Sequence, residues 1–211
     1  MGGSITDFFK GYLEKERLFT NKKVLQMNYT PETIPHREEQ IEEISKILAP
    51  SLKLERPSNM FIYGKTGTGK TLSVIKVLNS LKEVAKIKNI PLDILYVNCK
   101  LKRVADTEYR LIAHIAREFG EDIPITGLPR NAIYSKLFKK LETKKRLVIL
   151  ALDEIDQIVK KQGDEILYTL TRINTELENA QVCFIGISND LRFASELDPR
   201  IKSSLTEEEM N

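Results

Sequence analysis

The chain has 211 residues, a length that suits one domain better than two, and 41% hydrophobic and 30% charged residues, as in globular proteins. No apolar run approaches the roughly 20 residues that cross a bilayer, and the N-terminus has no secretory signal pattern, so we expect a cytoplasmic protein without a membrane partner. The 33 basic and 30 acidic residues leave a net charge of +3, which is too balanced to indicate a nucleic-acid partner by itself.

The first predicted element is an amphipathic helix, and we expect residues 1–18 to form an N-terminal extension. One helical face is formed by the apolar residues Ile5, Phe8, Phe9, Tyr12 and Leu13. Docking of this face on the chain's own domain explains it more simply than a partner site does. Residues 14–35 are charged and polar and contain prolines, so we expect them to run as an extended strap.

From the strap onward the pattern alternates between helices and strands, and we expect residues 19–211 to form one domain. Periodic apolar residues predict helices over 41–48, 74–85, 111–119, 133–141 and 166–177, with Asp164 as the cap of the last. Short apolar runs predict strands over 59–63, 92–97, 147–152 and 182–187. Strands that are apolar on both faces and alternate with helices form a parallel sheet covered on both sides. The predicted fold class is therefore three-layer α/β, and the acidic residues 207–209 are expected to be a solvated tail or an interrupted element.

The strongest chemical signal lies between the first predicted strand and the helix after it. The motif G-x-x-x-x-G-K-[ST] is matched by Gly64, Lys65, Thr66, Gly67, Thr68, Gly69, Lys70 and Thr71. Its glycines allow the backbone to wrap phosphates and to present N–H groups at a positive helix terminus. We expect Lys70 to neutralise the β- and γ-phosphates and the Thr71 hydroxyl to bind Mg²⁺. The alternative is a glycine-rich turn without a ligand.

Two adjacent acids, Asp153 and Glu154, follow the apolar strand over 147–152. The motif over residues 64–71 is called the P-loop. If the strand over 147–152 lies beside the strand that precedes the P-loop, a carboxylate at its carboxyl end lies near the metal. Asp153 is therefore a predicted Mg²⁺ ligand, usually through a water. Glu154 is then placed to orient and deprotonate the attacking water, which favours hydrolysis over transfer to a bound acceptor. Alone, the pair would be only a strand end and a turn. We interpret Asp156 as a loop or helix-start residue.

Two further candidates follow the last predicted strand. Asn189 lies at the strand tip, where a polar side chain can touch the γ-phosphate or hold the water, although an Asn-Asp pair also makes good turns. Arg200 lies in the segment 197–205 and has only Asp198 as a nearby acid. From the residues alone, a surface arginine is the simpler interpretation of Arg200.

Together these stretches resemble the AAA+ ATPases and, within them, the archaeal replication initiators related to the origin-recognition complex and its helicase-loading partner. The similarity covers about residues 19–209. It is carried by the strand and P-loop over 55–71 with its Arg-Pro-Ser-Asn lead-in, by the segments 188–191 and 197–205, and by Pro35, His36, Arg37 and Glu38.

This resemblance implies a P-loop NTPase of the AAA+ type that binds ATP or ADP with Mg²⁺ and hydrolyses ATP. Pro35, His36 and Arg37 would then lie beside the adenine. Asn189 would be the residue called sensor 1, and Arg200 the finger that reaches the γ-phosphate held by a neighbouring subunit. A finger supplied in trans makes the ATPase slow and dependent on assembly.

The resemblance also implies partners: double-stranded origin DNA at the nucleoid, the replicative helicase and neighbouring initiator subunits. A helical insertion that grips DNA is expected around residues 121–129. In the family, a helical lid with a second sensing arginine and a winged-helix domain that reads DNA follow the ATPase domain. Both are missing before Asn211, so we expect a C-terminally truncated ATPase domain, with most DNA contacts in the absent part.

Two other functions stay open. One is a nucleotide-dependent switch that holds ADP or ATP with negligible turnover. Measuring ATP turnover after mixing with the full-length protein would distinguish this switch from an ATPase. The other is a related AAA+ loader or signalling ATPase with no direct DNA contact, which the lack of a dense basic run favours.

Overall fold

The computed structural model describes residues 5, 9, 12, 34–100, 107–124, 126–205 and 208–210, and the chain divides into two compact units, Met1–Thr33 and Ile34–Asn211. In the first unit, Ile5, Phe9 and Tyr12 have a helical backbone and exposed side chains. Phe8, Leu13 and most of the expected strap lie outside the described residues. The boundary expected between residues 18 and 19 lies there too and stays a prediction.

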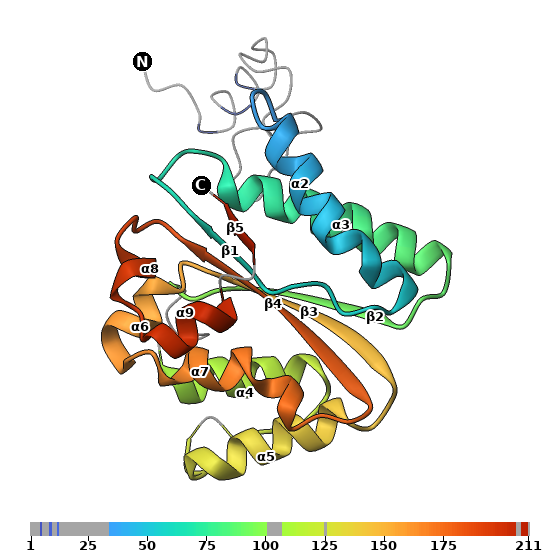
Figure 1. Ribbon diagram of the computed structural model, residues 1–211, viewed down its shortest axis with the longest axis vertical. Coiled ribbons are helices and arrows are strands. Elements are labelled where there is room, and N and C mark those ends of the chain that lie inside the picture. Colours follow the sequence, from blue (N-terminus) through green and yellow to red (C-terminus); the bar gives the residue numbers. More distant parts are fainter. Residues whose placement is uncertain are drawn as a thin grey trace. The chain divides into compact units, whose positions relative to one another are not determined.

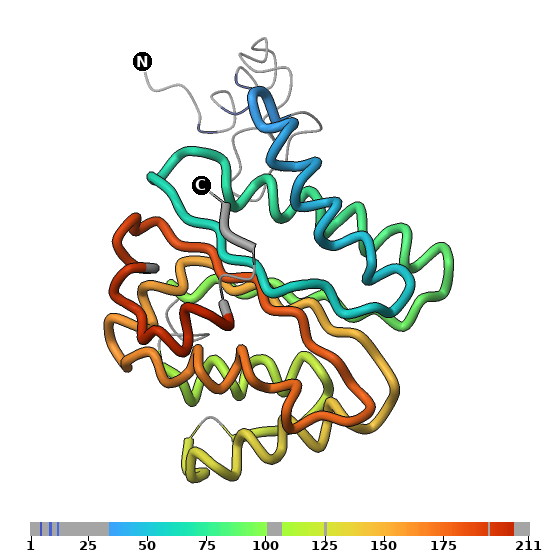
Figure 2. The backbone as a smooth tube through the Cα atoms, in the orientation of Figure 1, coloured from blue at the N-terminus to red at the C-terminus, as the bar shows by residue number. Residues whose placement is uncertain are grey.

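The second unit contains one parallel sheet, as the alternating pattern predicts. Its strands in the described part of the chain are β1 (Met60–Tyr63), β2 (Leu92–Asn98), β3 (Arg146–Asp153), β4 (Ala180–Ser188) and β5 (Glu208–Met210). Their spatial order is β2-β3-β4-β1-β5, and every neighbouring pair is parallel. The path in Figure 2 shows how the chain leaves β1 for the far edge at β2 and returns through β3 and β4. Of the two expectations for residues 207–209, the structure supports an interrupted element, because 208–210 pair with β1.

Helices cover both faces of the sheet and complete the predicted three layers (Figure 1). One face carries α2 (Glu38–Leu48), the short 3₁₀ helix η2 (Ala49–Lys53) and α3 (Lys70–Ile87). The other face carries α4 (Glu108–Glu118), α5 (Arg130–Leu141), α6 (Asp156–Gln162), α7 (Glu165–Thr171), η3 (Ile173–Thr175), α8 (Phe193–Glu196) and α9 (Pro199–Leu205). Among the described helices, none is long and apolar enough to cross a membrane.

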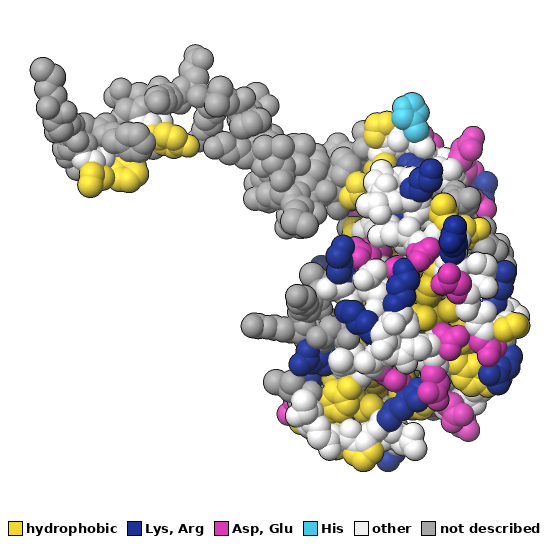
Figure 3. Space-filling view, turned by 90° about the vertical axis from the view of Figure 1, so that its left-hand side faces the viewer, with side chains coloured by type: hydrophobic (Ala, Val, Ile, Leu, Met, Phe, Trp, Pro, Cys, Tyr) yellow, Lys and Arg dark blue, Asp and Glu magenta, His cyan; other side chains and the backbone are white. Residues whose placement is uncertain are grey.

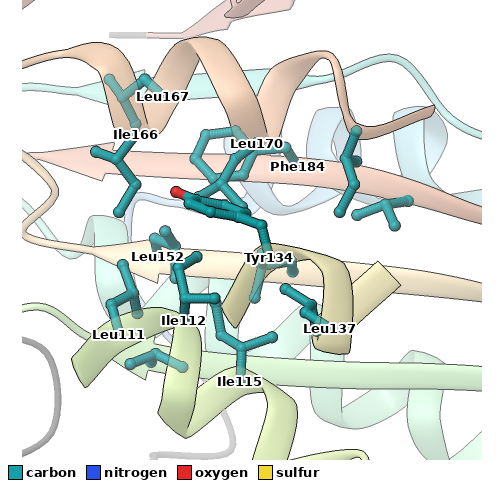
Figure 4. Packing of buried hydrophobic residues seen from close by; sticks show 14 of the residues in the cluster. Leu111, Ile112, Ile115, Tyr134, Leu137, Leu152, Ile166, Leu167, Leu170 and Phe184 are labelled. Atoms are coloured by element: carbon teal, nitrogen blue, oxygen red, sulfur yellow. The ribbon is translucent and has the colours of Figure 1, made fainter. Parts of the chain in front are cut away.

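Two hydrophobic cores lie between these layers because the pleat of β3 sends alternate residues to opposite faces. Val148, Leu150 and Leu152 join the larger core with α4, α5, α6 and α7, part of which is seen in Figure 4. Ile149 and Ala151 join the smaller core with α2 and α3. Each fully buried aliphatic side chain of this kind contributes about 1.5–3 kcal/mol. The cores fix the sheet that carries the site.

Strand register aligns the carboxyl ends of β1, β2, β3 and β4 along one side of the sheet. Asn98 pairs with Asp153 across β2 and β3, Asp153 pairs with Ile187 on β4, and Tyr63 pairs with Ser188 across β1 and β4. The chain then turns from β1 into α3 and from β3 into α6, at the left in Figure 1. The segments that follow these strands are thereby held close together.

The buried Asn59 ties three distant segments of the second unit together. Its Oδ1 accepts a hydrogen bond from the Phe184 N–H at 2.9 Å, and its Nδ2 donates to the Ser204 carbonyl at 3.0 Å. The entry to β1, the middle of β4 and the last turn of α9 are joined through this one amide.

The helix expected around residues 121–129 is wrong for the part of that segment that the structure describes. Residues 121–124 and 126–129 connect α4 to α5 without helical structure. Pro124 and Pro129 disfavour a helical conformation in the residues before them, and Gly127 has a φ of 107°, outside the helical region. The sequence between Gly120 and α5 therefore breaks a helix repeatedly.

The helix expected over 166–177 is shorter than predicted. α7 ends at Thr171, and the chain continues through η3. The Asn174 side chain accepts from the Val182 N–H at 2.7 Å and donates to the Val182 carbonyl at 2.8 Å, which fixes this segment on β4 rather than in a continued helix. Asp164 stands before α7, but its side chain makes no capping hydrogen bond; it accepts instead from the Asp198 N–H.

Candidate nucleotide-binding site

The phosphate-binding motif forms the turn between β1 and the 18-residue helix α3. Gly67 and Gly69 have φ values of 85° and 87°, which only glycine adopts at little cost. Gly69 precedes the first residue of α3, so the free N–H groups and the positive end of this helix open onto the loop. The side chains of Lys65, Thr66 and Thr68 belong to the same turn, and the Thr68 hydroxyl donates to the Lys65 carbonyl at 2.9 Å.

Lys70 places its ammonium group inside this turn. Its Nζ donates to the carbonyls of Gly64 and Lys65, each at 2.9 Å, and the residue is only 7% exposed. Burial lowers the pKa of Lys70, whereas the nearby carboxylate of Asp153 opposes that shift. A phosphate bound in the loop would pair with the Lys70 ammonium and offset the cost of burying its charge. The loop is therefore suited to binding an anion.

Asp153 is buried at the carboxyl end of β3 and is surrounded by donors. Its Oδ2 accepts from the Thr71 hydroxyl at 2.8 Å and from the Tyr96 hydroxyl at 2.7 Å, and its Oδ1 accepts from the Glu154 N–H at 2.8 Å. The pKa of Tyr96 is raised by burial and by its hydrogen bond to this carboxylate. The structure thus brings the two predicted metal ligands, Thr71 and Asp153, into direct contact.

The oxygen atoms of Thr71 and Asp153 fit Mg²⁺, which prefers hard oxygen ligands and usually takes one or two carboxylates together with phosphates and water. Among the described residues there is no cluster of three or more His, Cys, Asp or Glu that could hold a metal ion. Phosphate oxygens of a nucleotide and water would supply further ligands to a cation at this position.

Glu154 follows in a conformation that is unusual for its residue type. Its φ of 52° lies in the left-handed region, which costs about 1 kcal/mol for a residue with a Cβ. The turn is fixed by the Ile155 N–H, which donates to the Ile187 carbonyl at 3.1 Å. The Glu154 carboxylate lies 3.4 Å from the Lys100 ammonium. Strain of this kind is common at functional sites because the surrounding structure holds it in place.

A second polar network fixes the tip of β4, where Asn189 lies half-buried. The buried Ser188 hydroxyl donates to Asp156 Oδ1 at 3.1 Å and accepts from the Asp190 N–H at 3.0 Å. Lys160 closes the network through a 2.6 Å contact with the Asp190 carboxylate and a 3.7 Å contact with that of Asp156. Asp156 starts α6, in agreement with its interpretation as a loop or helix-start residue. The backbone on both sides of Asn189 is thereby fixed.

The predicted adenine-side residues differ in their relation to the P-loop. Arg37 lies over it, because a Cβ built at Gly69 would be 3.6 Å from Arg37 Cγ, and the Arg37 charge also contributes to lowering the pKa of Lys70. Pro35 and His36 are exposed in the turn before α2, where His36 has a φ of 61°. The structure therefore joins Arg37, but not Pro35 or His36, to the phosphate loop.

Arg200 is not part of the hydrogen-bond network around Asp153. It is exposed on α9, where its guanidinium contacts both carboxylate oxygens of Asp198, at 2.9 Å and 3.1 Å, and lies 5.5 Å from the centre of the Tyr168 ring. The hydrogen bonds from Arg200 lower the pKa of Asp198 to about 2. This placement agrees with the simple interpretation as a surface arginine, and it leaves the guanidinium open to a neighbouring molecule.

The sequence analysis missed three of these contacts: Tyr96, Lys100 and Ser188. Each reaches the site across strands or from the following loop, so no spacing within one segment indicates it. Tyr96 had one signal, since it is a polar-tipped aromatic near the end of an apolar strand and buried tyrosine hydroxyls need partners.

Basic and acidic side chains are interspersed on the described part of the face that carries the strand ends (Figure 3). This mixture agrees with the small net charge of the chain. The described side chains on this face therefore do not by themselves indicate a nucleic-acid surface.

Comparison with known proteins agrees with this fold. Residues 53–193 match the family described as AAA domain, and the chain belongs to that family. Within it, the chain resembles the ORC1-type DNA replication proteins. It is 50% identical over 210 residues to the one from Thermococcus onnurineus, which covers 98% of this chain and 50% of that protein. It is 52% identical over 206 residues to the one from Pyrococcus abyssi, which covers 96% of this chain and 48% of that protein. The chain spans about half the length of these relatives.

Solved structures show the same relation. The Aeropyrum pernix ORC1 protein in complex with DNA is 40% identical, with a TM-score of 0.82, over 89% of this chain and 47% of that one. The Aeropyrum pernix ORC2 protein in ADPNP-ADP complexes is 25% identical, with a TM-score of 0.74, over 89% of this chain and 50% of that one. The predicted AAA+ fold and the predicted resemblance are confirmed.

Proposed function

We propose that this chain is the ATP-binding and ATP-hydrolysing domain of a DNA replication initiator, and that Mg²⁺ accompanies the nucleotide. The observation that carries the proposal is the contact between Thr71 and Asp153 beneath a P-loop whose lysine is already held in place. The neighbouring Glu154 supplies a carboxylate at the same edge of the sheet. The ADPNP-ADP complexes of the related ORC2 protein support nucleotide as the ligand.

Each residue then has a distinct task. The N–H groups of the loop and the Lys70 ammonium bind the β- and γ-phosphates. Thr71 and Asp153 would hold Mg²⁺, which neutralises charge on the transferred phosphoryl group. Glu154 orients the attacking water and accepts its proton, and Asn189 holds that water or the γ-phosphate from the tip of β4. Arg37, with Pro35 and His36 in the turn beside it, faces the nucleotide from the α2 side.

Turnover by a single copy of the chain is expected to be slow, because Arg200 points to its own Asp198 and not to its own P-loop. We assign Arg200 to the active site of a neighbouring subunit, where a guanidinium stabilises the charge of the transition state. This arrangement makes hydrolysis depend on assembly of initiator subunits.

The proposed partners of the whole initiator are double-stranded origin DNA and the replicative helicase that it helps to load. The DNA complex of the related ORC1 protein supports DNA as a partner. Protection of an origin fragment from nuclease digestion by the initiator, with a fragment of scrambled sequence as the comparison, tests this part. Equal protection of the two fragments would contradict origin recognition.

Calorimetry tests the nucleotide site directly. ATP and ADP are titrated with Mg²⁺ into the unaltered chain, into Lys70→Ala, and into Lys82→Ala as a control, because Lys82 is exposed on the same helix. Loss of charge-assisted bonds predicts affinity about 10–100-fold weaker for Lys70→Ala. Lys82→Ala should bind as the unaltered chain does. Equal affinity of both variants, or no binding by the unaltered chain, would contradict the proposal.

A nucleotide-dependent switch is the second candidate, and the ion pair that occupies Arg200 favours it. The two functions differ in turnover, not in affinity. Release of phosphate after mixing with full-length initiator supports the ATPase, whereas tight binding without release supports the switch.

A further inference from the structure

Tyr96 reaches the nucleotide site across the sheet from the neighbouring strand. On β2 it pairs with Ala151 of β3, whose methyl side chain lies in the smaller core on the α3 side. Tyr96 packs against that same core, so both side chains are on one face. The small Ala151 side chain leaves room for the Tyr96 ring to extend along β3. The Tyr96 hydroxyl thereby reaches Asp153, which lies two residues after Ala151.

The hydroxyl of Tyr96 and that of Thr71 share one oxygen of Asp153. Both donate to Oδ2, at 2.7 Å and 2.8 Å, while Oδ1 accepts from the Glu154 N–H. The three donors come from different parts of the fold: the edge strand, the first turn of α3 and the turn after β3. Together they determine the rotation of a carboxylate that is only 2% exposed.

These donors differ in what happens when nucleotide binds. A Thr71 hydroxyl whose oxygen binds a metal ion can keep donating its proton to Asp153, but its position is then set by the ion as well. The Tyr96 hydroxyl belongs to a ring held by strand pairing and core packing, so its hydrogen bond persists.

We propose that Tyr96 is a positioning residue that holds the Asp153 carboxylate in the orientation required for Mg²⁺-dependent nucleotide binding. The inference rests on the function proposed above. Partners of metal-binding carboxylates tune affinity although they do not touch the metal, and their loss typically weakens metal binding about 10–100-fold.

Tyr96→Phe removes only the hydroxyl, and Tyr109→Phe is its matched control, because the Tyr109 hydroxyl donates to the Pro124 carbonyl at 2.9 Å in the loop after α4. For each variant and the unaltered chain, the ADP dissociation constant is measured by calorimetry with Mg²⁺ and again with excess chelator. The ratio of the two constants is the gain in affinity due to Mg²⁺.

In Tyr96→Phe this gain should fall about tenfold, while affinity in chelator changes by less than about twofold. Tyr109→Phe should keep the full gain. In an Asp153→Ala background, Tyr96→Phe should have no further effect on the gain.

Three results would overturn the inference. An unchanged Mg²⁺ gain in Tyr96→Phe shows that the hydroxyl does not position Asp153. An equal loss with Mg²⁺ and with chelator shows a purely structural role. No nucleotide binding by the unaltered chain refutes the proposed function itself, which separates that failure from the first two.

A second measurement needs no substitution. NMR of the unaltered chain should show the Tyr96 hydroxyl proton in slow exchange with water both before and after Mg²⁺ and ADP are added. Its loss on addition would mean that the hydrogen bond is released, against the inference.

Discussion

Gly186 on β4 offers a sharp test of how closely the sheet is packed beneath the site. It pairs with Phe61 of β1, and a Cβ built on it would lie 3.1 Å from Phe61 Cδ2, 3.3 Å from Phe184 Cε1 and 3.6 Å from Ile155 Cδ1. The first two distances are shorter than ordinary carbon contacts, and all three side chains are fully buried. Gly186→Ala therefore inserts a methyl group for which the Phe61 and Phe184 rings must shift by a few tenths of an ångström.

Two effects of opposite sign decide the result. Alanine restricts the unfolded chain more than glycine does. Where the folded backbone conformation suits alanine, this stabilises the folded state by about 0.4–1 kcal/mol. Overpacking a dense core costs typically about 1–3 kcal/mol, because neighbouring rings must move. The aromatic neighbours cannot retreat as a flexible chain end would, so we expect a net loss of about 1–2 kcal/mol in the free energy of unfolding.

Urea denaturation followed by circular dichroism measures this loss. For a domain of this size, about 2–4 °C of Tm is expected per kcal/mol, so thermal unfolding should move by a few degrees. The exposed Ser195→Ala, on α8, is a comparison that adds no atoms to the core. A Gly186→Ala protein as stable as the unaltered chain would refute the packing argument.

Further predictions concern the site and its surroundings. Glu154→Gln should bind Mg²⁺ and nucleotide but lose turnover about a hundredfold or more, measured by phosphate release. The carboxyl of Asp198, observed by NMR, should titrate near pH 2, and Arg200→Ala should move its midpoint toward 3.8. Because the pKa of Asp198 is lowered, its ion pair with Arg200 stabilises the fold fully at pH values above 3.8. That stabilisation is lost as the pH falls through about 2. Burial raises the pKa of Cys99 to about 12, so thiol reagents at pH 8 should modify it only after unfolding.

The strands and the phosphate loop were predictable because their information is local. The run over residues 147–152 is apolar at every position, which indicates a strand buried on both faces. The P-loop needs glycines at fixed spacing because its backbone must adopt left-handed angles, as Gly67 and Gly69 do. Such constraints are visible within one short segment.

The wrong helix at 121–129 came from the resemblance and not from the residues. The prolines at 124 and 129 and the glycine at 127 argue against a helix there. The shortened α7 has a different cause, since the periodic apolar residues continue but the Asn174 amide binds β4 instead. A single side chain that bonds to a distant strand is not visible in a periodicity.

The order and register of strands account for the missed site residues. Tyr96 contacts Asp153 only because β2 lies beside β3 with Tyr96 opposite Ala151. Ser188 contacts Asp156 only because β4 lies on the other side of β3. Nothing in either strand alone specifies its neighbour, so these contacts need the assembled sheet.

Asn59 connects the two places in the second unit to which separate tasks are proposed. Its amide links the base of the P-loop strand to the final turn of the helix that carries Arg200. Tilting that helix without disturbing the strand requires breaking the 3.0 Å bond to the Ser204 carbonyl. If Arg200 has the role proposed above, this hydrogen bond links the strand before one P-loop to the guanidinium that serves the neighbouring subunit.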